Sequence, residues 1–246
     1  MKNIVKEKEP KTLVEYRCAN KSNLTYKSAR YIFDNYKDKN KVLKQALLED
    51  QGYICCYCMQ RIEHKPNTKI EHFKPISKYP EKTLDYNNLF VACNGITTSK
   101  STNKEKKRIR HCDTSKGDCE GEQKTKKDND NCNLTINPID GEKYITKYSH
   151  NGEIEYLDLV ENDIEEILNL NNHILKRNRK ATLKAVITEI TRKRNSAWIV
   201  SQIKNKIKEY QEKNKENKYK PYCKVIIYFL EKKLSILSNK NQGRNL

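Results

Sequence analysis

The middle of the chain reads Cys55-Cys56-Tyr57-Cys58, then Lys69-Ile70-Glu71-His72-Phe73-Lys74-Pro75, then Asn88-Leu89-Phe90-Val91-Ala92-Cys93, and then His111-Cys112-Asp113-Thr114-Ser115-Lys116-Gly117. In this order, cysteines enclose an acid–histidine pair and an asparagine. The surrounding segment has no long hydrophobic periodicity, which is typical of a small fold stabilised by a metal ion rather than by a large core. The pattern predicts a structural metal centre that supports a chemically active site.

Cysteine spacing predicts the metal. A Cys-x-x-Cys pair presents two thiolates to one ion from a tight turn, and a second pair completes a tetrahedral zinc site. The predicted ligands are Cys55, Cys58, Cys93 and Cys112. His111 and Cys119 are alternatives to Cys112 as the fourth ligand, and the competing interpretation is a set of free thiols in a reduced protein.

The acid–histidine pair predicts phosphodiester chemistry. In a metal-dependent phosphodiesterase, an acid binds a hard cation and a neutral histidine takes a proton from water. We therefore assign His72 as the general base and expect Asn88 to hold its imidazole through the far nitrogen. Glu71 and Asp113 are the expected ligands of Mg²⁺ or Mn²⁺. Taken singly, a Glu-His pair is also typical of a surface ion pair, and an asparagine of a turn.

Together, these residues resemble the HNH (ββα-metal) endonucleases. The family pattern is matched in order by Cys55/Cys58, Glu71-His72-x-x-Pro75, Asn88-Leu89, Cys93 and Cys112-Asp113-x-x-Lys116. Two departures stand out: Asp113 replaces the usual Asn or His, and a long insertion separates Cys93 from Cys112. The first keeps an oxygen ligand, and the second leaves the fourth zinc ligand open. The resemblance implies a hydrolase that needs a catalytic divalent cation beside its structural zinc.

Further segments resemble one subfamily, the HNH nuclease subunit of Septu anti-phage systems, which also accompanies some retrons. They include His111-Cys112-Asp113, Asn137-Pro138, Asn151-Gly152-Glu153-Ile154 and Leu168-Asn169-Leu170-Asn171. This resemblance implies a partner ATPase of the ABC/AAA type that restrains or licenses the nuclease, and cleavage of nucleic acid during phage infection. The alternatives are a zinc-bearing nucleic-acid-binding module without catalysis and an adaptor whose helices bind an ATPase.

The charge balance favours a polyanionic partner. The chain has 50 Lys and Arg against 32 Asp and Glu, a net charge of +18, and such a balance favours nucleic acids. The other explanation for the positive charge is an AT-rich genome, because such genomes enrich Lys and Asn in proteins. The predicted contacts to nucleic acid, with DNA favoured over RNA such as tRNA, are Lys74, Lys107, Arg108, Arg110 and Lys116. Lys116 has a second interpretation, as a charge that favours its helix end.

Two features of the sequence, its apolar runs and its first ten residues, bear on the expected cellular location. No apolar run approaches the ~18 residues of a membrane span, and residues 1–10 have no apolar signal region, so we expect a cytoplasmic protein. Its nine cysteines, an odd number, should then stay reduced. Cys18, Cys56 and Cys223 adjoin apolar or aromatic residues and are predicted to be buried.

The predicted fold is α+β and mainly helical, with a zinc-supported ββα-metal core. Residues 1–52 are expected to form an N-terminal helical arm whose first 20 residues are irregular. Residues 53–132 should hold the nuclease core, with a strand over 68–73 that carries Glu71 and His72 and a basic insertion over 94–110. Residues 133–246 should form a small antiparallel sheet, with strands near 134–139, 143–148 and 153–159 and a hairpin turn at Asn151-Gly152, followed by C-terminal helices.

Overall fold

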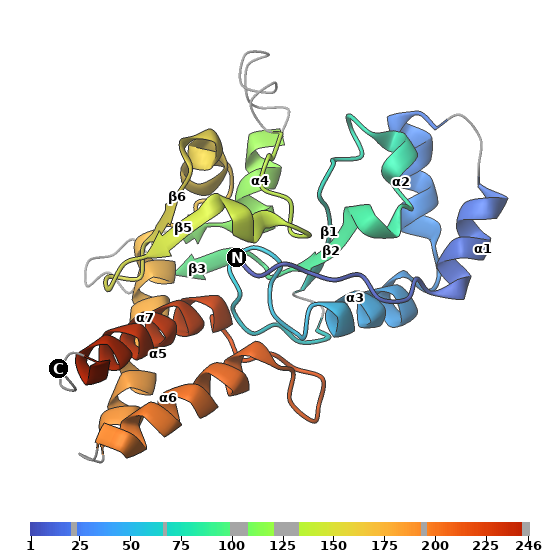
Figure 1. Cartoon of the computed structure of the whole chain (residues 1–246). Coiled ribbons are helices and arrows are strands. Elements are labelled where there is room, and N and C mark those ends of the chain that lie inside the picture. Colours follow the sequence, from blue (N-terminus) through green and yellow to red (C-terminus); the bar gives the residue numbers. More distant parts are fainter. Residues whose placement is uncertain (21–23, 66–67, 99–107, 121–132, 193–195, 243–246) are drawn as a thin grey trace.

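The computed structural model describes the chain except for residues 21–23, 66–67, 99–107, 121–132, 193–195 and 243–246 (Figure 1). The described part is mainly helical and contains three antiparallel sheets of two strands each. This confirms the predicted α+β class. None of its helices is both long enough and apolar enough to cross a membrane.

The N-terminal region is more helical than expected. It contains α1 (Lys11–Ala19), α2 (Tyr26–Asn35), a π-helical turn (Lys39–Leu43) and α3 (Lys44–Asp50). The irregular arm predicted for the first 20 residues is therefore wrong at α1. Its single fully buried apolar side chain, Leu13, gives too weak a hydrophobic pattern to indicate a helix.

A ββα arrangement carries the predicted motifs. Strand β1 (Lys69–His72) pairs antiparallel with β2 (Leu89–Ala92), so that His72 lies opposite Leu89. Helix α4 (Cys112–Glu120) follows. Between β2 and α4, the insertion contains the hairpin of β3 (Ile96–Thr98) and β4 (Arg108–Arg110). Residues 99–107 of this insertion lie outside the described part of the chain.

The C-terminal region begins with one hairpin rather than a three-stranded sheet. Strand β5 (Ile145–Tyr148) pairs with β6 (Ile154–Tyr156), joined through the predicted Asn151-Gly152 turn, where Gly152 has φ 83°. The expected strand near 134–139 is absent. There, the backbone N–H groups of Thr135 and Ile136 donate to the Asp163 carboxylate, at 2.6 and 2.7 Å, instead of to a neighbouring strand.

Helices complete the chain. They are a π-helical turn (Asp163–Ile167), α5 (His173–Thr191), α6 (Ser196–Gln211) and α7 (Cys223–Gln242). Short 3-10 turns lie at Pro80–Lys82, Tyr86–Asn88, Gly141–Tyr144 and Asp158–Val160.

One continuous apolar core joins these regions. Its buried side chains extend from Met1 to Leu230 and include Leu47, Phe90 and Ile164. The three-part division of the chain stays a prediction. Among the other cysteines, Cys56 and Cys223 are buried as expected, whereas Cys18 is exposed and its predicted burial is wrong.

A buried arginine ties the hairpin to α5. The Arg179 side chain is fully buried. Its Nε donates to the carbonyl of Gly152, and its Nη2 donates to the carbonyl of Leu170 at 2.9 Å. The β5–β6 turn and the segment before α5 are thereby held on the same helix.

We predict that Arg179→Met destabilises the protein by about 2–4 kcal/mol, because buried carbonyls lose their donors. Urea unfolding followed by circular dichroism measures the loss. Arg177→Met is the matched control, since this neighbouring arginine on α5 is exposed. Equal stability of the two variants would contradict the role given to Arg179.

Candidate active site and metal centre

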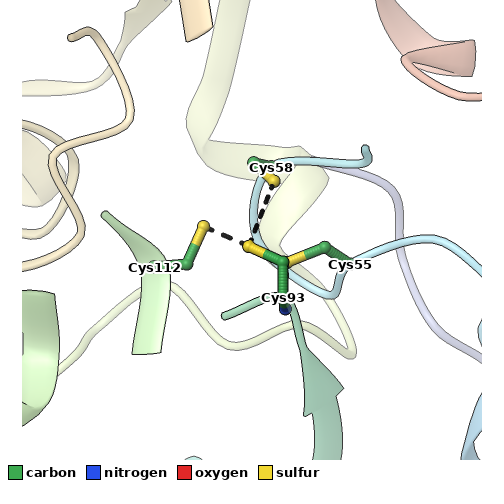
Figure 2. A group of neighbouring side chains, drawn as sticks. All are labelled: Cys55, Cys58, Cys93 and Cys112. Atoms are coloured by element: carbon green, nitrogen blue, oxygen red, sulfur yellow. Dashed lines mark hydrogen bonds between the residues drawn. The ribbon is translucent and has the colours of Figure 1, made fainter. Parts of the chain in front are cut away.

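Four cysteine side chains converge from separate segments. Cys55 and Cys58 lie in the turn before β1, Cys93 directly follows β2, and Cys112 begins α4. All four sulfurs lie within 4.8 Å of one another. Figure 2 shows the side chains turned toward a common centre. The predicted ligand set is therefore brought together by the fold.

The spacing of the sulfurs fits a metal rather than disulfides. Cys55 Sγ lies 3.9 Å from Cys112 Sγ, and Cys58 Sγ lies 4.0 Å from Cys93 Sγ. A zinc ion bound tetrahedrally by thiolates separates its sulfurs by about 3.8 Å, whereas a disulfide bond is about 2.05 Å long. The four residues are at most 3% exposed. The cluster is consistent with structural zinc.

The backbone bends sharply where it delivers these thiols. Met59, after Cys58, has φ 62°, and Cys112 itself has φ 54°, values that non-glycine residues adopt rarely. The Cys112 N–H donates to the carbonyl of Leu168 at 2.8 Å, and the Cys93 N–H donates to Cys55 Sγ at 3.4 Å. The segment before α5 thus helps to fix the last thiol.

His111 lies beside the cluster. Its Nδ1 is 3.2 Å from Cys112 Sγ and 3.9 Å from Cys93 Sγ. The compact group found among the described residues nevertheless consists of the four cysteines. The side chain of Cys119, the other alternative ligand, lies outside the described part of the chain.

A cavity of about 560 Å³ is lined by residues of β1 and α4. Glu71 and His72 of β1 and Asp113 and Lys116 of α4 line it, together with Lys69. The predicted acid–histidine pair and the predicted second acid therefore share one cavity.

Glu71 is held from two sides inside the protein. Its Oε1 accepts hydrogen bonds from the Tyr57 hydroxyl at 2.8 Å and from Lys116 Nζ at 2.5 Å. Tyr57 is fully buried, Lys116 is 2% exposed and Glu71 is 4% exposed. Because a carboxylate has two oxygens, this fixed geometry leaves Oε2 as a further acceptor.

The surroundings of Asp113 disfavour its ionised form. Burial, and next the charge of Glu71, raise the pKa of Asp113 to about 8, and Lys69 Nζ lies 3.4 Å from its Oδ2. Two carboxylates facing one cavity repel each other, and a divalent cation favours the ionised form of both. The donor set of Glu71 and Asp113 therefore fits a hard cation.

His72 is oriented as a proton acceptor. A carbonyl oxygen only accepts, so the 3.0 Å bond to the Thr83 carbonyl requires the proton on Nε2 and leaves Nδ1 unprotonated. The Phe33 ring packs edge-on against the imidazole, with centroids 4.5 Å apart. Burial lowers the pKa of His72 to about 4, which keeps the ring neutral near pH 7.

The ring nitrogen Nε2 of His72 bonds to the Thr83 carbonyl and not to the expected Asn88. Asn88 was predicted to hold it, but the Asn88 Oδ1 accepts from the Lys74 N–H at 2.7 Å. Its Nδ2 donates to the carbonyls of Lys74 and Lys82, at 3.0 and 3.1 Å. Asn88 thus closes the loop that ends beside Thr83, and the bond to His72 comes from the Thr83 carbonyl.

The predicted nucleic-acid contacts take different places. Lys116 is buried and donates to Glu71 and, at 2.6 Å, to the carbonyl of His72, while it also lines the cavity, so its contact to nucleic acid stays a prediction. Lys74 lies over the Phe73 and Tyr79 rings, at 5.1 and 5.5 Å. Arg110 is exposed on β4. The side chain of Arg108 and all of Lys107 lie outside the described part of the chain.

Several neighbours of the cavity were not singled out from the sequence. They are Tyr57, Thr83, Lys69 and the α2 residues Tyr26, Arg30 and Phe33. The spacing of Tyr26, Arg30 and Phe33 is that of one helix face, which was the available signal. No sequence pattern indicates the role of the Thr83 carbonyl, because every residue has a backbone carbonyl.

We predict that protein purified without added metal carries about one zinc per chain, measured by inductively coupled plasma mass spectrometry. Cys58→Ser should remove most of that zinc and lower the thermal midpoint, because metal binding contributes to folding. Cys18→Ser is the control, since Cys18 is exposed and lies outside the cluster. A zinc-free protein with an unchanged midpoint would contradict the assignment.

A comparison with known proteins shows a partial likeness. No family model matches the chain. A segment of 66 residues is 33% identical to the Septu protein PtuB of Bacillus thuringiensis, and it covers 26% of this chain and 26% of that protein. The predicted likeness to a Septu component is confirmed over this quarter of the chain, as a distant similarity.

Proposed function

We propose that this protein is a metal-dependent endonuclease of the HNH type, which hydrolyses phosphodiester bonds in nucleic acid. One observation carries the proposal. His72, with Nδ1 unprotonated, shares a cavity with Glu71 and with Asp113, which directly follows Cys112 of the buried four-cysteine cluster. A neutral imidazole and two carboxylates are the groups that hydrolysis of a phosphodiester requires.

In this mechanism His72 acts as the general base. Its Nδ1 accepts a proton from the attacking water, while Nε2 donates to the Thr83 carbonyl and fixes the ring. Phe33 restricts the ring further through its edge-on contact. Because burial lowers its pKa, the imidazole is neutral near pH 7, the form that can accept a proton.

Asp113 and the second oxygen of Glu71 would hold Mg²⁺ or Mn²⁺. Such a cation stabilises the negative charge that develops on the phosphate. Lys116 and Tyr57 would act on Glu71, because both donate to its Oε1. Their hydrogen bonds fix the direction in which this carboxylate faces the cavity.

The cysteine cluster would supply the scaffold. Zinc bound by Cys55, Cys58, Cys93 and Cys112 would connect the turn before β1, the end of β2 and the start of α4. His72 follows from β1 and Asp113 from α4, so the distance between base and cation site would depend on this ion.

Nucleic acid is the proposed substrate, with DNA favoured over RNA such as tRNA. The net charge of +18 supports a polyanion. Lys74, Lys107, Arg108, Arg110 and Lys116 remain proposed contacts, and exposed Lys69 beside Asp113 joins them.

The similarity to a Septu protein supports a role as effector in anti-phage defence, acting in the cytoplasm with a partner ATPase of the ABC/AAA type. Co-expression with an ATPase encoded beside it, followed by purification through a tag on one of them, tests this assembly. Separate elution of the two proteins, with and without nucleotide, would remove the ATPase from the proposal.

Nuclease activity itself is tested through His72. Plasmid and RNA are incubated with the protein in Mg²⁺, in Mn²⁺ and in EDTA, and the partner is added where it co-purifies. We predict that His72→Ala lowers the cleavage rate about 10²–10⁴-fold, the usual contribution of a general base.

His64→Ala serves as the control for this variant, since His64 is exposed and outside the cavity. Unchanged cleavage by His72→Ala would remove this residue from the mechanism. Binding of nucleic acid without cleavage by the unmodified protein under every condition would favour the non-catalytic binding module.

The cation ligand is tested through Asp113. Asp113→Ala should raise the Mg²⁺ concentration for half-maximal cleavage roughly ten-fold or more, because a charged ligand is lost. Asp113→Asn should recover much of the activity, since an oxygen ligand stays in place. Asp158→Asn, at an exposed aspartate, is the control. A Mg²⁺ requirement that Asp113→Ala leaves unchanged would show that this residue does not bind the cation.

A further inference from the structure

Helix α2 forms one wall of the candidate active site although it precedes the ββα unit. Tyr26, Arg30 and Phe33 follow one another at intervals of four and three residues, and so share a helix face. Phe33 packs on His72, and Tyr26 and Arg30 line the cavity that contains Glu71. In Figure 1 this helix lies beside the segment that follows β1. The face is therefore aimed at the reacting groups.

Arg30 has donors suited to a phosphate. Its side chain is 59% exposed, and its Nε donates to Asp34 Oδ2 at 2.9 Å. A guanidinium has further N–H groups on its two Nη atoms, in a planar fork that matches phosphate oxygens. The bond to Asp34 fixes the base of this fork. Arg30 is thus a positioned cation at the edge of the cavity.

Tyr26 provides an aromatic surface next to this cation. It is 51% exposed, although it lines the cavity with Arg30, one helical turn away. Aromatic rings in such grooves stack on nucleic-acid bases. Bases within a duplex have their faces covered by neighbouring pairs, so an unpaired base is the matching ligand.

We propose that Tyr26 and Arg30 of α2 form a nucleotide subsite at the rim of the active-site cavity, in which an unpaired base stacks on Tyr26 and its phosphate binds Arg30. The subsite rests on the proposed nuclease function and narrows its substrate class. The preferred substrate is single-stranded or locally unpaired nucleic acid, held so that a phosphodiester bond reaches the cavity.

The experiment measures binding apart from cleavage. Full-length His72→Ala protein is titrated into a short labelled single-stranded oligonucleotide, and into a duplex of the same sequence, with fluorescence anisotropy as the readout. Tyr26→Ala and Arg30→Gln are introduced into this protein. Their matched controls on the same helix are Tyr31→Ala, at a tyrosine that is 70% exposed, and Lys27→Gln, at an exposed lysine.

Tyr26→Ala should weaken single-strand binding about ten-fold, the scale of a lost base stack, and Arg30→Gln by about as much, through a lost charge-assisted phosphate contact. Both controls should stay within about two-fold of the parent. Tyr26→Phe should restore binding, since the ring is kept. Arg30→Gln should also lower the slope of log affinity against log salt by about 0.7, as expected for one phosphate contact to a single strand. Duplex binding should change less with Tyr26→Ala.

Equal affinities of the α2 variants and their controls would overturn the subsite. A loss with Tyr26→Ala that is as large on the duplex would overturn the unpaired base as its ligand. Tyr26 and Arg30 are exposed, so these variants should keep the fold, which circular dichroism checks. If the α2 variants weaken binding but the unmodified protein cleaves no substrate, the subsite stands and the nuclease is overturned. If the unmodified protein cleaves and the α2 variants bind as tightly as their controls, the nuclease stands and the subsite is overturned.

Discussion

The convergence of four buried thiols is the constraint on which the central part of the molecule depends. Cys55 and Cys58 come from one turn, Cys93 from the end of β2 and Cys112 from the start of α4. These segments bring little regular structure of their own, since β1 and β2 have four residues each. Four uncoordinated thiols this close would be costly to ionise in a buried site, and a zinc ion removes that cost. The ion would also set the distance between the strand bearing Glu71 and the helix bearing Asp113.

A second, electrostatic connection reinforces the first. Lys116 from α4 reaches Glu71 on β1 and also donates to the carbonyls of His72 and Phe73. A buried ion pair is strongly destabilising when one partner is removed, because the other charge is left unpaired. The ion pair therefore favours a single orientation of α4 relative to β1. The same contacts keep the acid in a fixed orientation, so structural and proposed catalytic roles meet in one hydrogen-bond network.

The sequence predicts those features of the site that depend on residue type and spacing. It does not predict the features that depend on where side chains and backbone carbonyls point in the folded protein. The cysteine set, the strand that carries Glu71-His72 and the hairpin turn at Gly152 follow from spacing and turn preference. The partner of His72 did not, because the carbonyl of Thr83 belongs to the backbone and every residue has one. Lysine is rarely buried, so the burial of Lys116 depends on an acid 45 residues earlier in the chain, a contact that no local pattern indicates. Helix α1 was missed for a simpler reason, since it contributes little apolar surface.

The β3–β4 hairpin has a consequence for how such chains vary in length. Thr98 pairs with Arg108, and Ile96 pairs with Arg110, next to Cys93 and Cys112. Because this ladder brings the two ends of the insertion together, the positions of both thiols are independent of how many residues lie beyond Thr98 and Arg108. Lengthening such a loop costs little conformational entropy. A peptide tag or reporter grafted between Thr98 and Arg108 should therefore leave the metal geometry intact.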